Sequence, residues 1–145
     1  MTLKQQIHSN LITIIETAFL PDVVPVKKRL FSFEEVVTSP TICVSRAGAL
    51  KEIAGNSNLY QVEAGFEIIG YIRTSYDIQN TGSLTDACEE VLEKIEEAIL
   101  VDETIYDLGV TKIEIVSEDA IPDYENNIGY AILNLTITYL TNNQI

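Results

Sequence analysis

The sequence predicts an α+β fold: a two-layer sandwich in which a mostly antiparallel sheet of about four strands carries two amphipathic helices on one face. Two segments place apolar residues at helical spacing. Several other segments alternate apolar and polar residues, as strands with one buried face do. The expected order is α-β-β-α-β-β, and we expect all 145 residues to form a single domain.

The first helix is expected from Leu3 to about Phe19, where apolar residues recur every three or four positions. Thr2 precedes it and can act as the N-cap, because its hydroxyl can accept a hydrogen bond from a free amide of the first turn. Pro21 and Pro25 then end the helix, since proline lacks the amide hydrogen and its ring blocks helical continuation.

Residues 20–39 are the least regular part of the sequence and predict an extended arm or a long loop. The arm contains a basic triplet and two aromatic residues: Lys27, Lys28, Arg29, Phe31 and Phe33. The triplet has two interpretations. It is either a solvated loop or part of an arm that docks on an acidic patch of another subunit, with Phe31 or Phe33 as an apolar anchor.

Two strands follow the arm. Residues 41–45 predict a short strand with a β-branched core face, and the small and polar residues of 47–58 predict a turn region. Residues 60–73 predict the longest strand, because apolar and polar positions alternate along it. At about 45 Å, a strand of this length is expected to bend near Gly65 or Gly70.

The second helix is expected to begin at Ser83, with Asp86 three residues later in a spacing that resembles a capping box. Its apolar stripe runs to Ile99, and its opposite face carries Glu89, Glu90, Glu93, Glu96 and Glu97. A turn at 80–82 precedes it. Two strands complete the chain, from Val110 to Ser117 and from Gly129 onward, with a loop expected at 118–127.

One face of the sheet is left without helices in this arrangement. Its side chains form a polar set of mixed charge: Glu63, Glu67, Arg73, Lys112, Glu114, Asn134, Thr136 and Thr138. Long sheet edges are also left exposed, and such edges invite strand addition from another chain.

Charge and composition exclude several classes of function. The chain has 22 acidic and 9 basic residues and a formal charge of −13, so it repels both a phosphate backbone and an anionic membrane. No apolar run approaches the ~20 residues of a membrane-spanning helix, and the N-terminus lacks the features of a signal peptide. Cys43 and Cys88 are expected to be reduced core thiols of a cytosolic protein, with a disulfide as the open alternative.

Catalytic, metal-binding and cofactor sites are not predicted. His8 is the one histidine, and beside Ile7 we expect it at the surface or at the core boundary. Four acidic residues of the 118–127 loop could hold calcium: Glu118, Asp119, Asp123 and Glu125. Their spacing is not that of an EF-hand, and Pro122 interrupts it, so a solvated acidic loop is expected. Glycine-rich phosphate-binding motifs do not occur.

The layout as a whole is distinctive. An amphipathic helix is followed by an irregular arm, a short strand after Ser39-Pro40, a long strand and a leucine-rich helix. The closing strand pair ends in the stretch from Gly129 to Tyr139, with the pattern Leu-x-Ile-x-Tyr. In this order and length the chain resembles the tail terminator and tail-completion (neck) proteins of long-tailed bacteriophages and related prophage proteins.

This resemblance implies a structural virion protein of the tail or neck, made in the cytoplasm of the host bacterium, and not an enzyme. Such proteins form a ring, usually a hexamer, on the end of the finished tail tube. The ring stops tube polymerisation and offers the surface that the head connector binds. The implied partners are other copies of the chain, the tail tube protein and the head connector or neck protein, with DNA only as passing cargo and no membrane.

Two sets of residues are candidates for this role. The basic triplet Lys27, Lys28 and Arg29 is expected to meet the acidic helix of a neighbouring subunit, with Phe31 and Phe33 as anchors. Glu63, Glu67 and Glu114 are expected to face the bore, because an acidic lumen repels DNA and lets it slide.

Two kinds of alternative stay open. The chain could be another assembly part, such as a head–tail adaptor, a stopper or a tail-tube subunit. It could instead be a small cytosolic α+β ligand-binding domain or enzyme, which would need a deep pocket lined by convergent polar groups.

Overall fold

The computed structural model describes residues 1–36, 40–53, 59–73 and 83–142. The expected turn at 80–82 and part of the turn at 47–58 lie outside the described residues. The helices and strands are α1 (Leu3–Ala18), β1 (Val26–Lys27), η1 (Phe33–Glu35), β2 (Thr41–Ile53), β3 (Tyr60–Arg73), α3 (Leu84–Val101), η2 (Thr104–Leu108), β4 (Val110–Asp123) and β5 (Ile128–Thr141).

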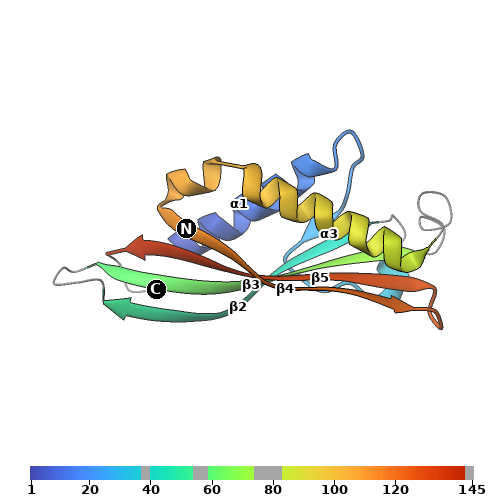
Figure 1. The fold of residues 1–145 in the computed structure, drawn as a ribbon. Helices are drawn as coiled ribbons and strands as arrows, with labels where there is room; N and C mark the ends of the chain where they lie inside the picture. Colours follow the sequence, from blue (N-terminus) through green and yellow to red (C-terminus); the bar gives the residue numbers. More distant parts are fainter. Residues whose placement is uncertain (37–39, 54–58, 74–82, 143–145) are drawn as a thin grey trace.

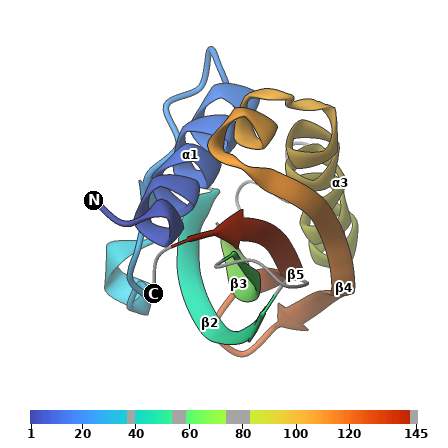
Figure 2. The ribbon, with the colours of Figure 1, turned by 90° about the vertical axis from the view of Figure 1, so that its left-hand side faces the viewer.

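The architecture is the predicted α+β arrangement, with α1 and α3 side by side over one face of a single sheet (Figure 1). The sheet has five strands in the order β1-β2-β3-β5-β4, one more than expected. The additional strand, β1, is two residues of the arm that pair in parallel with β2. All other pairs are antiparallel. Seen from one end, the strands twist strongly beneath the two helices (Figure 2).

The two helices begin where the sequence predicts. Thr2 caps α1 through a capping box, in which its hydroxyl accepts from the Gln5 amide at 3.2 Å and the Gln5 side chain accepts from the Thr2 amide at 2.8 Å. Ser83 caps α3, and its hydroxyl accepts a hydrogen bond from the Asp86 amide at 3.4 Å. None of the helices in the described residues is both long and apolar enough to cross a membrane.

The main core lies between the helices and the sheet. Large fully buried side chains come from every layer and include Ile7, Leu11, Ile68, Ile95 and Tyr139. At 25 cal/mol per Å² of apolar surface, this burial is the dominant favourable contribution to folding. Cys43 and Cys88 are both buried and neither forms a disulfide, as expected of two core thiols.

The expected position of His8 is wrong. Its side chain is only 3% exposed, and its Nε2 donates a hydrogen bond to the carbonyl oxygen of Val44 at 2.6 Å. Burial lowers the pKa of the imidazole, so the neutral form is favoured. The ring also packs edge-on against Phe66, at 5.7 Å between centroids. A histidine that sits on the apolar stripe of a helix is thus part of the core, with one polar contact across to β2.

Two predicted loops are strands instead. Residues 47–53 continue β2, and residues 118–123 continue β4. The sequence favoured turns there because both segments are rich in small or charged residues, yet each lies at a sheet edge and is largely exposed. Pairing with a long central neighbour extends these strands although their side chains bury little surface.

The irregularity expected in β3 near Gly65 or Gly70 lies instead on β2, across from Gly65. The register of β3 with β5 is unbroken from Tyr60 to Arg73, whereas the pairing of β2 with β3 shifts between Arg46 and Ala49. A side chain at Gly65 would lie 3.1 Å from the Ala47 Cβ. The irregularity is therefore in β2, whose backbone here is hydrogen-bonded to a neighbouring strand on one edge only, so an extra residue disturbs a single ladder.

We expect Gly129→Ala to lower the free energy of unfolding by about 1–3 kcal/mol, because overpacking a filled core forces its neighbours to shift. A Cβ at this position would lie 2.5 Å from the Cys88 Sγ and 3.1 Å from the Leu84 Cδ1. Urea unfolding measures the effect. Gly48→Ala is the matched control, since no atom lies within 4 Å of its added Cβ, and it should change the free energy little. Equal effects of the two substitutions would contradict the packing described.

Candidate assembly surfaces

The face of the sheet opposite the helices is ordered by strand register. Directly paired residues of antiparallel strands point to the same side. Glu63 lies opposite Leu50 and Thr138, Glu67 opposite Ser45 and Asn134, and Glu114 opposite Thr136. We call this the outer face. The register places all three candidate bore residues on it, as the strand alternation predicts.

The three glutamates are spread over the outer face. Glu63 and Glu67 are four residues apart on β3, which is about 13 Å along a strand. Glu114 lies two strands away, about 10 Å across the sheet, and its carboxylate pairs with the Lys112 Nζ at 3.0 Å. Such spacing makes a charged surface and not a paired-carboxylate site. Thr138, expected on this face in contact with solvent, is buried at 8% exposure.

The outer face is not bare along its whole length, because the arm covers one end of it. Phe31 packs edge-on against Tyr71 at 5.8 Å between centroids, and Tyr71 packs in the same way against Tyr130 at 5.6 Å. Val36 is fully buried in this cluster, and its carbonyl oxygen accepts a hydrogen bond from Arg73. The remaining members of the cluster are Cys43, Ile69 and Ile128.

Arg29 is held within the arm. Its guanidinium forms a bidentate salt bridge with the Glu35 carboxylate, in which Nη1 donates at 3.1 Å and Nη2 at 2.6 Å. The guanidinium carbon also lies 5.1 Å from the centre of the Phe31 ring. The Glu35 carboxylate also accepts from the Ser32 amide at 3.0 Å. These hydrogen bonds, of which the one from Arg29 has the larger effect and the one from Ser32 the next, lower the pKa of Glu35 to about 2.

The basic triplet is therefore divided. Lys27 ends β1 and Lys28 follows it, and both side chains are exposed. Within the described residues, neither lysine forms an ion pair at 4.0 Å or less. The side chain of Phe33, the second expected anchor, lies outside the described residues. The two lysines are thus the part of the triplet that is available to a partner.

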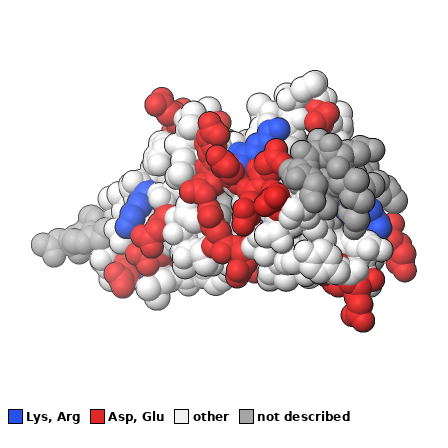
Figure 3. Space-filling view, turned by 45° about the vertical axis from the view of Figure 1, so that its right-hand side comes forward, with Lys and Arg blue, Asp and Glu red and all other residues white. Residues whose placement is uncertain are grey.

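An acidic band joins α3 to β4 (Figure 3). Glu96 of α3 and Glu118 of β4 share a hydrogen bond, with Glu93 and Glu97 on the same stretch of helix. This hydrogen bond, together with burial and the charges of Glu118 and Glu93, raises the pKa of Glu96 to about 6. The sequence could not reveal this pair, because it depends on β4 continuing beyond Ser117 and on how α3 crosses it.

The four acidic residues considered as a calcium site do not converge. Glu118 turns to Glu96, while the Asp123 carboxylate accepts hydrogen bonds from the Asn126 amide at 3.3 Å and side chain at 2.7 Å. Asp119 pairs with Ile132 in the next register position, so it points to the other side of the strand. Across the described residues, no three His, Cys, Asp or Glu side chains are placed to hold a metal ion.

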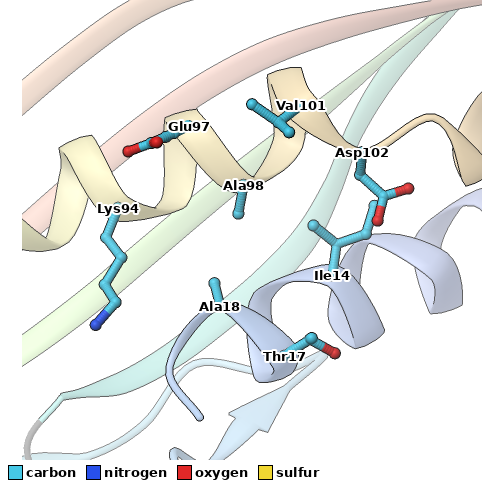
Figure 4. A pocket seen from close by; sticks show the side chains of 8 residues that line it. All are labelled: Ile14, Thr17, Ala18, Lys94, Glu97, Ala98, Val101 and Asp102. Carbon is cyan, nitrogen blue, oxygen red and sulfur yellow. The ribbon is translucent and has the colours of Figure 1, made fainter.

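A groove of about 400 Å³ separates the ends of the two helices (Figure 4). Ala18 and Ala98 face each other across it, while Glu97 points away along α3. The Lys94 Nζ lies 5.0 Å from the centre of the Phe19 ring, and the Thr17 hydroxyl donates to the Thr13 carbonyl at 2.8 Å. Its polar groups are thus engaged locally, and the groove lacks the convergent arrangement that a catalytic pocket needs.

We expect Glu96→Gln to flatten the pH dependence of stability between about pH 4.5 and 6. The raised pKa of Glu96 means that the shared proton stabilises the fold below the unfolded value near 4.5, and that this contribution is lost as pH rises through about 6. Glutamine keeps a neutral donor toward Glu118 at every pH. With screening discounted, the gain at pH 8 should be at most about 1 kcal/mol.

Thermal unfolding from pH 4 to pH 8 measures this difference. Glu89→Gln is the control, because it removes the same charge from an exposed position of the same helix outside the pair. The same pH profile in both variants would contradict the shared proton.

No protein-family model and no curated protein matches the chain. Among solved structures, it is similar to a chain of the "Virion of native gene transfer agent (GTA) particle", with a TM-score of 0.42 and 10% sequence identity. The alignment covers 96% of this chain and 92% of that chain. These comparisons assign the chain to no family.

Proposed function

We propose that the chain is a structural virion protein of a phage-like particle, a tail terminator that assembles into a ring of six identical subunits. The ring caps the tail tube, ends its polymerisation and presents the joining surface to the head connector. DNA passes through the bore. The layout of the sequence that resembles tail terminator and neck proteins supports this proposal.

The observation that carries the proposal is the helix-free outer face of the sheet. Both helices cover the opposite face, so a ring built with its helices outward presents the outer face to the bore. Glu63 and Glu114 are exposed there and Glu67 is half-buried. An acidic wall repels the phosphate backbone, which allows DNA to pass without being retained.

The arm supplies the contact between subunits in this proposal. Lys27 and Lys28 are exposed cations without an ion pair among the described residues, and the acidic band on α3 and β4 is a concentrated opposite charge. A contact between two different surfaces is heterologous, and it closes into a ring when the rotation permits. Phe31, expected as an anchor on the neighbour, instead packs on its own sheet and fixes the base of the arm.

The same surfaces would serve an adaptor, a stopper or a tail-tube subunit, which differ in their position along the virion. The ring proposal is preferred to a small enzyme or ligand-binding domain. The groove between the helices is open, and its lysine and threonine are engaged in local contacts. An assembly subunit needs broad charged surfaces, and these are what the chain presents.

Sedimentation analysis and electron microscopy of the purified chain test the proposal. We expect a particle of about six times the chain mass of 16.1 kDa, with a central pore wide enough for a DNA duplex and the outer face of the sheet toward it. Added tail-tube ends are the second condition to test, because they can template the ring. A monomer under both conditions contradicts the proposal, as does a ring with Glu63 on its outer wall.

Charge reversal tests the arm. We expect Lys27→Glu with Lys28→Glu to weaken assembly at least tenfold, since two attractive contacts per interface become repulsive. The further exchanges Glu93→Lys and Glu97→Lys should restore assembly if the arm meets the acidic band. The mass of the assembled species in solution reports both steps. Undiminished assembly of the first variant, or failure of the exchanged variant to recover, would exclude this contact.

A further inference from the structure

We propose that residues 44–53, the free part of β2, pair edge to edge with β4 of the next subunit. One antiparallel sheet then runs through the assembly. This inference rests on the proposed self-assembly and identifies the backbone surface that joins the copies. The partner is a second copy of the chain. Four independent features of the two strands support it.

The first feature is that both strands have a free edge. β1 pairs with β2 only at Ile42 and Cys43, so from Val44 to Ile53 no described strand lies on that side. β4 is the terminal strand at the other side of the sheet and pairs with β5 alone. Free backbone donors and acceptors over such lengths are templates for another strand.

The second feature is exposed apolar surface at both edges. On β2, Leu50 is 57% exposed and Ile53 is 67% exposed. On β4, Val116 is 59% exposed and Ile121 is 44% exposed. Val116 lies at the register shift between Ile115 and Ser117, so it has no paired residue on β5. Joining the two edges would remove these side chains from water.

The third feature is opposite charge. Arg46 and Lys51 of the free part of β2 lie opposite Phe66 and Val62, so both are on the helix side of the sheet. Glu118 of β4 is on the same side, opposite Leu133, while the other acidic residues of β4 are on the outer face. Opposite charges on the same face of facing strands stabilise a pair and like charges destabilise it, so Glu118 is the acid that can pair with Arg46 or Lys51. Pairing of β4 with β4, or of β2 with β2, is therefore disfavoured.

The fourth feature is strand direction. β2 is antiparallel to β3, β3 to β5 and β5 to β4, so β2 and β4 run in opposite directions. A rotation about an axis close to the strand direction preserves these directions in every copy. The β4 edge of one copy then meets the β2 edge of the next in antiparallel orientation, and the contact is heterologous and able to close. Pro122, which has no amide hydrogen, sets the limit of the paired part of β4.

Site-specific disulfide formation between two singly substituted chains tests the pairing. Leu50→Cys is mixed in turn with Glu114→Cys, Val116→Cys and Asp119→Cys under mild oxidation, and the native Cys43 and Cys88 remain because both are buried. We expect mixed disulfide dimers at one or two of the three positions and few dimers of either chain with itself. A chain with both cysteines should give a ladder that ends at the size of the closed ring.

The control is Leu50→Cys with Glu89→Cys, an exposed position of α3 away from both edges, which should give no mixed dimer. Leu50→Asp should weaken assembly at least tenfold and leave the thermal unfolding of the monomer unchanged, because the side chain is exposed. Predominant self-linking of Val116→Cys would overturn the inference in favour of a twofold β4 contact.

Mass measurement on the same samples separates the two proposals. A ring that assembles but forms no mixed disulfide, and that tolerates Leu50→Asp, overturns the strand pairing and leaves the ring function standing. A chain that stays monomeric up to its solubility limit and also at tail-tube ends overturns both.

Discussion

The antiparallel pairing of β3 with β5 is the constraint on which the rest of the structure depends. It runs for fourteen residues on each strand without a shift, and it places both strands in the middle of the sheet. Because side chains alternate between faces, a slip of one residue would turn Phe66 and Leu135 to the solvent and the polar set to the core. This register determines which side chains face the helices, which contact the arm and which charges lie on the outer face.

The two faces of the sheet have different roles because of that alternation. One face buries the apolar stripes of α1 and α3, and His8 joins this core by a hydrogen bond to β2. The outer face changes along its length, from glutamates and threonines at one end to Tyr71, Tyr130 and Ile128 at the other. The arm covers the aromatic end, where exposure would be costly. The polar and acidic part is left for contact with solvent or a partner.

The two edges of the sheet differ in charge. β2 is not paired with β1 after Cys43, and this free part of β2 carries two basic residues, whereas β4 carries four acidic residues. Glu118 also meets Glu96 of α3, so the β4 edge and the acidic helix form one continuous negative surface. A subunit with unlike edges is suited to head-to-tail assembly, in which each copy offers one edge and receives the other.

The sequence by itself determined the α+β class, both helices with their caps Thr2 and Ser83, the central strands and the outward direction of Glu63, Glu67 and Glu114. These are local properties: helical spacing, alternation and capping are written in neighbouring residues. Only the tertiary structure decided that His8 is buried, that residues 47–53 and 118–123 are strands, that Arg29 is paired with Glu35 and that Glu96 meets Glu118. Each of these depends on a partner from another segment of the chain, and a local sequence pattern does not identify that partner.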